Sequence, residues 1–82
     1  MATRMIRMYA TAWCGDCSRA KRFFETNGIV YEYIDINDDP AGARIVEQAN
    51  NGNRSVPTII FPDGSMLVEP SNQELASKLD VT

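Results

Sequence analysis

The sequence contains no histidine and only two cysteines, Cys14 and Cys17. A structural zinc site usually takes four nitrogen or sulfur ligands, and this chain cannot supply them. A disulfide between two cysteines so close in sequence closes a very small loop, so it removes little entropy from the unfolded chain. We therefore expect no metal site, and we interpret the pair as redox-active rather than structural.

The sequence also lacks a long apolar run and an excess of positive charge. No segment approaches the roughly 20 apolar residues that a membrane span needs, and residues 1–7 show no leader-peptide pattern. The formal net charge of −3 provides no basic surface for nucleic acid. We expect a cytoplasmic protein with neither a membrane nor a nucleic-acid partner, in a compartment where most thiols stay reduced.

The chain length fits a single domain over residues 1–82, in which hydrophobic patterns mark strands and helices. We expect strands over Arg4–Tyr9, Ile29–Ile36, Thr58–Phe61 and Ser65–Val68, and helices over Gly15–Asn27, from Asp39 to the Asn50–Asn53 cluster, and after Ser71. A strand, helix and strand in succession imply a parallel pair with a right-handed crossover. The turn residues 62–64 predict an antiparallel hairpin. The sequence thus predicts an α/β fold of order βαβαββα, with a four-stranded mixed sheet flanked by three helices.

Local signals support three of these elements. Ile29–Ile36 is dense in β-branched and aromatic residues, which predicts a strand covered on both faces. Asp39 followed by Pro40 is typical of a helix start, with Asp at the N-cap and Pro at the first helical position. Ser71 and Glu74 match a capping box, so they predict the start of the last helix.

The two cysteines are expected where the first strand gives way to the first helix. Cys14 falls at or just before the helix N-terminus, where free backbone N–H groups and the helix dipole favour an anionic thiolate. This position indicates that Cys14 is the attacking nucleophile. Cys17 lies one turn into the helix on the same side, so it can attack a mixed disulfide on Cys14 and release a reduced product.

Two neighbours of the nucleophile have both a functional and a structural interpretation. Asp16 places a carboxylate beside Cys14 and opposes a second negative charge, which would tune the thiolate. Asp in the first turn of a helix is also favourable whatever the chemistry. Trp13 either shapes a docking surface beside the thiol or is an amphipathic ring at a loop.

Val56-Pro57 is the second candidate site segment. A proline is allowed at the start of the strand that follows it. If its peptide bond were cis and faced the cysteines, the Val56 N–H and C=O would be open to an extended substrate. Recognition through the main chain would place little demand on the substrate's side chains.

Together these motifs resemble the glutaredoxin branch of the thioredoxin-fold superfamily, most closely the mycoredoxins of actinobacteria. The resemblance runs from about Arg4 to Leu79 and rests on Trp13-Cys14-Gly15-x-Cys17, Tyr33-x-Asp35-Ile36, Asn51 to Thr58, and Asp63-Gly64-Ser65. It implies a thioredoxin fold, a cis peptide before Pro57, a nucleophilic Cys14, and a thiol-binding groove beside Val56 with Arg54 nearby. The implied enzyme is a thiol-disulfide oxidoreductase with no tightly bound cofactor. It would reduce mixed disulfides and protein clients with a low-molecular-weight thiol, mycothiol or glutathione.

Departures from the family pattern leave the reductant open. The Lys that many glutaredoxins place three residues before the first cysteine is Thr11 here. Ser71 and Asn72 lie in the segment that matches the acidic pair of glutaredoxins, and they are candidate substrate-binding residues. Asp16 replaces the usual aromatic residue. Two alternatives remain. One is a thioredoxin-like electron donor to ribonucleotide reductase or peroxidases, served by a thioredoxin-type reductase. The other is an iron–sulfur glutaredoxin that holds its cluster through Cys14 of two subunits.

Overall fold

The computed structural model describes residues 5–81, and its elements follow the predicted order. They are β1 (Ile6–Ala10), α1 (Gly15–Thr26), β2 (Tyr31–Asp35), α2 (Pro40–Ala49), β3 (Thr58–Ile60), β4 (Met66–Val68) and α3 (Asn72–Leu79). Arg4, where we expected the first strand to begin, lies outside the described residues. At its other end β1 includes Ala10 and so continues past the expected Tyr9.

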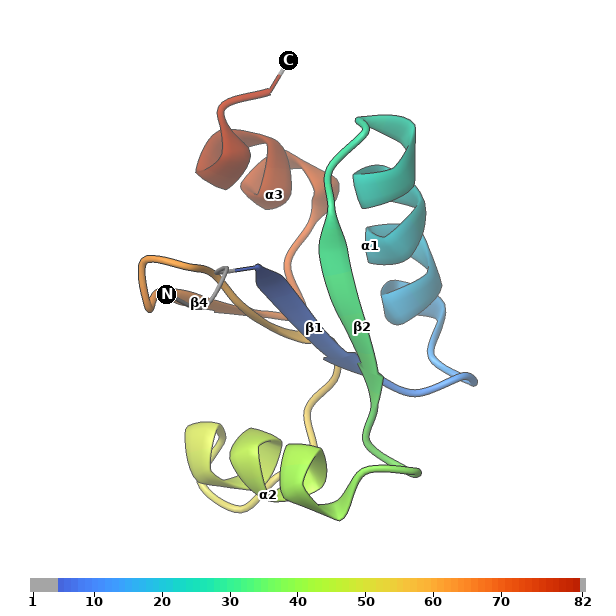
Figure 1. The fold of residues 1–82 in the computed structure, drawn as a ribbon, viewed down its shortest axis with the longest axis vertical. Coiled ribbons are helices and arrows are strands. Elements are labelled where there is room, and N and C mark those ends of the chain that lie inside the picture. The colour runs from blue at the N-terminus through green and yellow to red at the C-terminus, as the bar shows by residue number, and fades with distance from the viewer. Residues whose placement is uncertain (1–4, 82) are drawn as a thin grey trace.

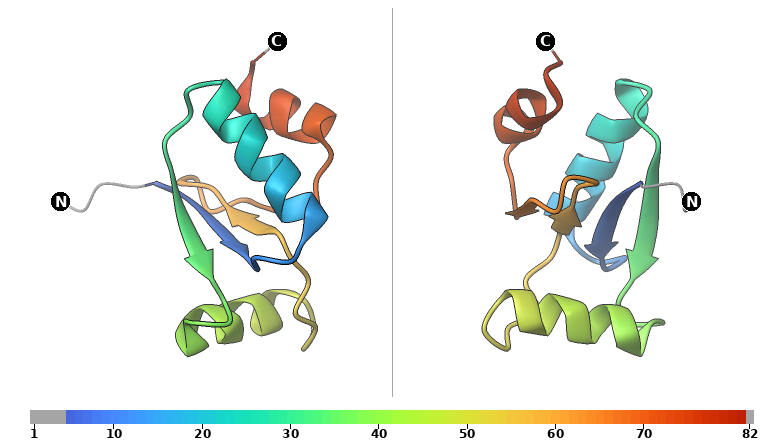
Figure 2. Two further views of the ribbon diagram at one scale, coloured as in Figure 1. Left: turned by 90° about the vertical axis from the view of Figure 1, so that its right-hand side faces the viewer. Right: turned by 60° about the vertical axis from the view of Figure 1, so that its left-hand side comes forward.

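The four strands form the expected mixed sheet. β1 pairs in parallel with β2 and antiparallel with β3, which in turn pairs antiparallel with β4, giving the order β2-β1-β3-β4. Figures 1 and 2 show α1 and α3 on one face of this sheet and α2 on the other. Because β1 and β2 are parallel, their carboxyl ends meet at the same edge. The loop that leads to the cysteines leaves the sheet at this edge.

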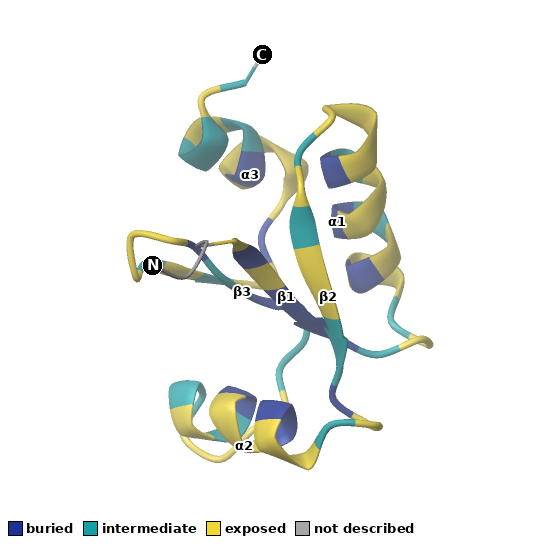
Figure 3. Ribbon diagram, in the orientation of Figure 1, coloured by how far each residue is buried: buried dark blue, intermediate teal, exposed yellow. Residues whose placement is uncertain are grey.

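Two hydrophobic clusters join the helices to the sheet. The larger cluster lies between the sheet and helices α1 and α3, and it contains Ile6, Met8, Ala10, Cys17, Ala20, Phe24, Ile59, Phe61 and Leu75. The smaller cluster lies under α2 and contains Tyr9, Ile36, Ala43 and Val46. β1 contributes to both because successive strand residues point to opposite faces. In Figure 3 it is accordingly buried along most of its length.

The predicted helix starts are confirmed. Asp39 caps α2 by accepting a hydrogen bond from the Gly42 N–H at 3.0 Å, and Pro40 follows as the first helical residue. At α3 the Ser71 hydroxyl accepts from the Glu74 N–H at 3.1 Å, while the Glu74 carboxylate accepts from the Ser71 N–H at 2.8 Å. Each of these caps satisfies backbone donors that a helix cannot satisfy internally.

The β3–β4 hairpin is confirmed, with shorter strands than expected. Phe61 and Ser65 belong to the turn, where the Phe61 N–H donates to the Ser65 C=O at 2.9 Å. The Gly64 N–H donates to the Phe61 C=O at 2.9 Å. Gly64 has a φ of 88°, which glycine adopts without the steric cost that other residues incur.

β2 is shorter and more exposed than the sequence predicts. It covers Tyr31–Asp35 instead of Ile29–Ile36, because the Ile29 N–H donates to the Phe24 C=O at 2.9 Å and so ends α1. The prediction that this strand is covered on both faces is wrong. β2 is an edge strand, and Tyr33 is 40% exposed. Tyrosine tolerates this position because its ring can pack while its hydroxyl stays in water.

A buried polar network holds the loop that precedes β3. Thr58 is fully buried, and its hydroxyl donates to the Ser55 C=O at 2.7 Å and accepts from the Asn50 side-chain amide at 3.2 Å. The same Asn50 amide donates to the Val46 C=O at 2.8 Å. The network ties the C-terminal end of α2 to both ends of the segment that contains Val56 and Pro57.

Replacing Thr58 with valine is expected to lower the free energy of unfolding by about 1–3 kcal/mol. Valine keeps the shape but leaves the buried Ser55 C=O without its donor. Urea unfolding of both proteins measures the difference. Thr26→Val, an exposed threonine at the end of α1, is the matched control and should change stability much less. Equal midpoints for wild type and Thr58→Val would show that the network contributes nothing.

Candidate functional site

Cys14 is the N-cap residue of α1. Its φ of −97° and ψ of 117° are extended, and its Sγ accepts a hydrogen bond from the Cys17 N–H at 3.0 Å. The sulfur therefore occupies the place of a capping oxygen, where a helix N-terminus favours negative charge. On its other side the thiol donates to the Val56 C=O at 3.7 Å. Cys14 is half-buried, and both cysteines are free thiols in this structure.

Cys17 lies on the buried face of α1 and is 1% exposed. Burial first, and then the hydrogen bond with Cys14, raise the pKa of the Cys17 thiol to about 12. A backbone hydrogen bond with Thr11 acts in the opposite direction. Cys17 is thus a protonated thiol at neutral pH, packed directly behind Cys14.

The Val56–Pro57 peptide bond is cis, as the resemblance implied. Pro57 is buried, and its C=O accepts from the Glu69 N–H at 2.8 Å, which fixes the segment against the residue that follows β4. The Val56 C=O faces Cys14, whereas the Val56 N–H has no hydrogen-bond partner within residues 5–81. An unpaired backbone donor beside a thiol can pair with an extended chain that brings a sulfur to it.

Arg19 connects the site to the start of α3 through contacts that the sequence did not predict. Its guanidinium donates to Asp16 at 3.1 Å, to the Asn72 side chain at 3.1 Å and to the Pro70 C=O at 3.2 Å. Asp16 is therefore paired rather than isolated beside Cys14. An arginine one turn after an N-terminal acid was the only available sequence signal, because the contact with Asn72 spans distant parts of the chain.

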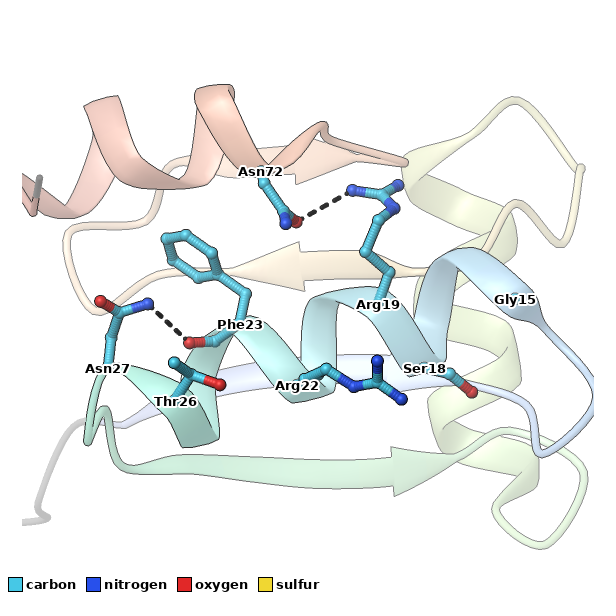
Figure 4. A pocket seen from close by; sticks show the side chains of 8 residues that line it. All are labelled: Gly15, Ser18, Arg19, Arg22, Phe23, Thr26, Asn27 and Asn72. Atoms are coloured by element: carbon cyan, nitrogen blue, oxygen red, sulfur yellow. Dashed lines mark hydrogen bonds between the residues drawn. The ribbon is translucent and has the colours of Figure 1, made fainter.

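A groove of about 500 Å³ begins beside the nucleophile at Gly15 and runs along α1 towards Asn27 (Figure 4). Asn72 forms its wall from α3, and Phe23 gives it an apolar surface. Arg19 and Arg22 both line it, and none of its lining residues is acidic. The groove thus carries two cationic side chains, of which Arg19 is paired with Asp16, on a chain whose net charge is −3.

The other predicted site residues are distributed unevenly around the thiol. Trp13 precedes Cys14 and is 92% exposed, so it is available to a partner. Ser71 caps α3 with its side chain. Arg54 is exposed, and within residues 5–81 its ion pair is with Glu47 of α2, at 2.7 Å. The structure thus brings Cys14, Cys17 and Val56–Pro57 into contact, and it places Arg54 in another network.

Neither a metal cluster nor a membrane span is found among residues 5–81. No group of three or more His, Cys, Asp and Glu side chains is arranged to hold a metal ion in this part of the chain. None of its helices is long and apolar enough to cross a membrane.

A thiol at a helix N-terminus beside a cis-proline segment, on this mixed sheet, defines a dithiol protein of the thioredoxin fold. A sequence model described as Glutaredoxin matches residues 6–66. The chain belongs to the glutaredoxin family. A Mycobacterium tuberculosis protein assigned to the glutaredoxins is 44% identical over 79 residues, which cover 96% of this chain and 94% of that one. Mycoredoxin 1 of Corynebacterium glutamicum is 32% identical over 75 residues, 92% of each chain.

Solved structures agree on the fold. A variant of the thioredoxin-like protein BC3987 superimposes with a TM-score of 0.84 at 25% identity, covering 98% of this chain and 100% of that one. The glutaredoxin of Archaeoglobus fulgidus gives a TM-score of 0.75 at 21% identity, covering 95% and 88% of the two chains. The second likeness shows the fold alone.

Proposed function

We propose that this protein is a thiol-disulfide oxidoreductase that reduces mixed disulfides and protein disulfides in the cytoplasm, with a low-molecular-weight thiol as the reductant. The contact of Cys14 with both the α1 N-terminus and Val56 is the observation that supports it most. On one side of the Cys14 sulfur, backbone N–H groups of α1 can stabilise a thiolate. On the other side, the Val56 backbone is available to bind the partner. Membership of the glutaredoxin family supports the same chemistry.

The reaction uses the two cysteines in turn. The Cys14 thiolate attacks one sulfur of the substrate disulfide, and the other sulfur leaves as a thiolate, so that Cys14 is held in a mixed disulfide. Either Cys17 attacks the Cys14 sulfur and releases the second product, or, where the group held on Cys14 is a small thiol, a second small thiol attacks the sulfur of that group and releases the Cys14 thiolate. Two electrons pass to the substrate, and the oxidised product is the Cys14–Cys17 disulfide or a disulfide of the small thiol.

We propose that the partner lies across Val56 and enters the groove lined by Asn72 and Arg22. The unpaired Val56 N–H supplies a main-chain hydrogen bond, and exposed Trp13 provides an apolar contact beside the sulfur. The Ser71 hydroxyl already caps α3, so Ser71 contributes to the site through its position at the N-terminus of this helix. Asp16 acts through its ion pair with Arg19.

The likeness to mycoredoxin 1 favours mycothiol as the small thiol. The test is a single model peptide carrying either mycothiol or glutathione in a mixed disulfide, each assayed with its own thiol and reductase. We expect turnover of both, with the mycothiol-capped peptide reduced at least about tenfold faster, a difference of ~1.4 kcal/mol in transition-state binding. Preference for glutathione would reverse the assignment of the thiol. Turnover of neither peptide would contradict the proposed function.

A further inference from the structure

A second cavity, of about 290 Å³, lies beside the buried thiol rather than beside the nucleophile. It is lined by Cys17, Thr11, Lys21, Tyr33 and Asp35, among others. It differs from the groove between α1 and α3, although Ser18 lines both, and the proposed reaction gives it no role.

The strand geometry explains why these residues meet. Successive β2 residues point to opposite faces, so Tyr31, Tyr33 and Asp35 share the face towards α1. The Tyr31 ring packs on Phe24 of α1 with centroids 4.9 Å apart, which shows that this face of β2 is the one towards α1. Further along the same face, Lys21 Nζ lies 5.6 Å from the centre of the Tyr33 ring.

Asp35 lies at the carboxyl end of β2, where the register pairs it with Ala10. The chain enters the active-site loop immediately after Ala10. Asp35 therefore lies beside Thr11, and both residues line the same cavity as Cys17. Its Oδ1 accepts from the Asn37 N–H at 2.9 Å, so the carboxylate is held at the edge of the sheet.

Resolution by Cys17 requires a proton acceptor. Burial raises the pKa of this thiol to about 12, so almost none of it is ionised at neutral pH. Once Cys14 is in a mixed disulfide its thiol no longer acts on Cys17, but the burial remains. The thiolate is the nucleophile in disulfide exchange, so the proton has to leave as the new bond forms.

Only one group in the cavity suits this task. A protonated Lys21 has no acceptor, and burial raises the pKa of the Tyr33 phenol, with Cys17 and Asp35 acting in the same direction, so it stays protonated. Asp35 is the only carboxylate among the residues that line the cavity. We propose that Asp35 accepts the Cys17 proton through this cavity during the resolving step. The proposal rests on the proposed function and assigns a general base to it.

The step balances as follows in bonds and electrons. The Cys17 S–H proton passes to the Asp35 carboxylate while the Cys17 sulfur bonds to Cys14 Sγ. The bond between Cys14 Sγ and the partner sulfur breaks, and the partner leaves as a thiolate. The protein dithiol loses two electrons and the partner gains them. A carboxylate suffices as acceptor because the Cys17 sulfur loses its affinity for the proton as its bond to Cys14 Sγ forms.

If Asp35 acted only through its negative charge, it would slow the resolving step instead of assisting it. Among residues 5–81, the charged or titratable groups around Cys17 are the N-cap residue Cys14, Asp16 and Lys21 on α1, and Tyr33 and Asp35 on β2. A negative charge beside a thiol disfavours its thiolate, so removing Asp35 as a mere charge would speed the resolving step. Removing a general base would slow it. The sign of the change distinguishes the two roles.

The experiment is stopped-flow reaction of the reduced protein with Ellman's reagent. Attack by Cys14 releases a first coloured thiolate, and attack by Cys17 on the resulting mixed disulfide releases a second. We expect Asp35→Asn to slow the second phase by at least about tenfold at pH 7 and to leave the first unchanged, since positioned bases typically contribute 10²–10⁴. The asparagine oxygen can still accept from the Asn37 N–H, so the turn is preserved.

Asp38→Asn is the matched control, because Asp38 is exposed near the same strand end, and it should leave both phases unchanged. Asp35→Glu should restore part of the second phase, and the deficit of Asp35→Asn should shrink as rising pH ionises Cys17 directly. An equal or faster second phase in Asp35→Asn overturns the proposal. Loss of the first phase in the wild type would instead refute the proposed function.

Discussion

Replacing Cys14 with serine is expected to reduce mixed-disulfide turnover by at least about a thousandfold, because a serine hydroxyl forms no disulfide and is not ionised at neutral pH. The substitution is mild for the fold. Serine is a preferred N-cap, so its oxygen can accept from the Cys17 N–H in place of the sulfur. The loss therefore reports chemistry rather than unfolding. Turnover of the capped peptide, coupled to reductant consumption, is the measurement.

Ser77→Ala is a suitable control for this variant. Ser77 is exposed on α3, away from the thiol, and its removal should leave both turnover and the unfolding midpoint unchanged. Equal midpoints for Cys14→Ser and wild type would show that the fold is intact. If Cys14→Ser then kept wild-type activity, another group would have to be the nucleophile, and the proposed function would fall.

The positions of the two cysteines were predictable from the sequence because they depend on local features. Cys14 and Cys17 are one helical turn apart, and a small-residue loop before a helix was enough to place the first at the N-cap. Placing Val56-Pro57 against the cysteines was only a conditional expectation from the residues, and the resemblance then implied it. The Arg19 contacts with Asn72 and Pro70, and the cavity shared by Cys17 and Asp35, join segments distant in sequence. Periodicity gives no information on such contacts.

The order of the helices and strands was predictable for the same reason. How far each strand is buried by its neighbours was not. An apolar run such as Ile29–Ile36 is typical of a buried strand, but strand order across the sheet decides whether it is central. Gly42 is a second example. A Cβ at this position of α2 would lie 3.0 Å from Cγ2 of Ile34, so the helix approaches the sheet closely only because the residue is glycine. Nothing in the local sequence indicates that approach.

Replacing Cys17 with serine is expected to divide the substrates into two classes. Mixed disulfides with a small thiol should still be reduced within a few fold of wild type, because a second small thiol from solution can attack the small-thiol sulfur bonded to Cys14 and release the Cys14 thiolate. Intramolecular protein disulfides should be reduced at least about a hundredfold more slowly, because the variant loses a resolving thiol held at high effective concentration. Serine is nearly isosteric with cysteine, and Cys17→Ala provides a second variant should a buried hydroxyl destabilise the core.

The two substrates should be measured on the same preparations, with a small-thiol-capped peptide in one assay and a peptide with an internal disulfide in the other. The contrast follows from the structure: Cys14 is half-buried and within reach of solvent thiols, whereas Cys17 is 1% exposed and can react only with a sulfur already bound to Cys14. Full activity of Cys17→Ser on both substrates would remove Cys17 from the mechanism, and with it the need for a base in the cavity behind it. Equal loss on both would mean that small thiols cannot reach the Cys14 mixed disulfide, so that every turnover passes through Cys17.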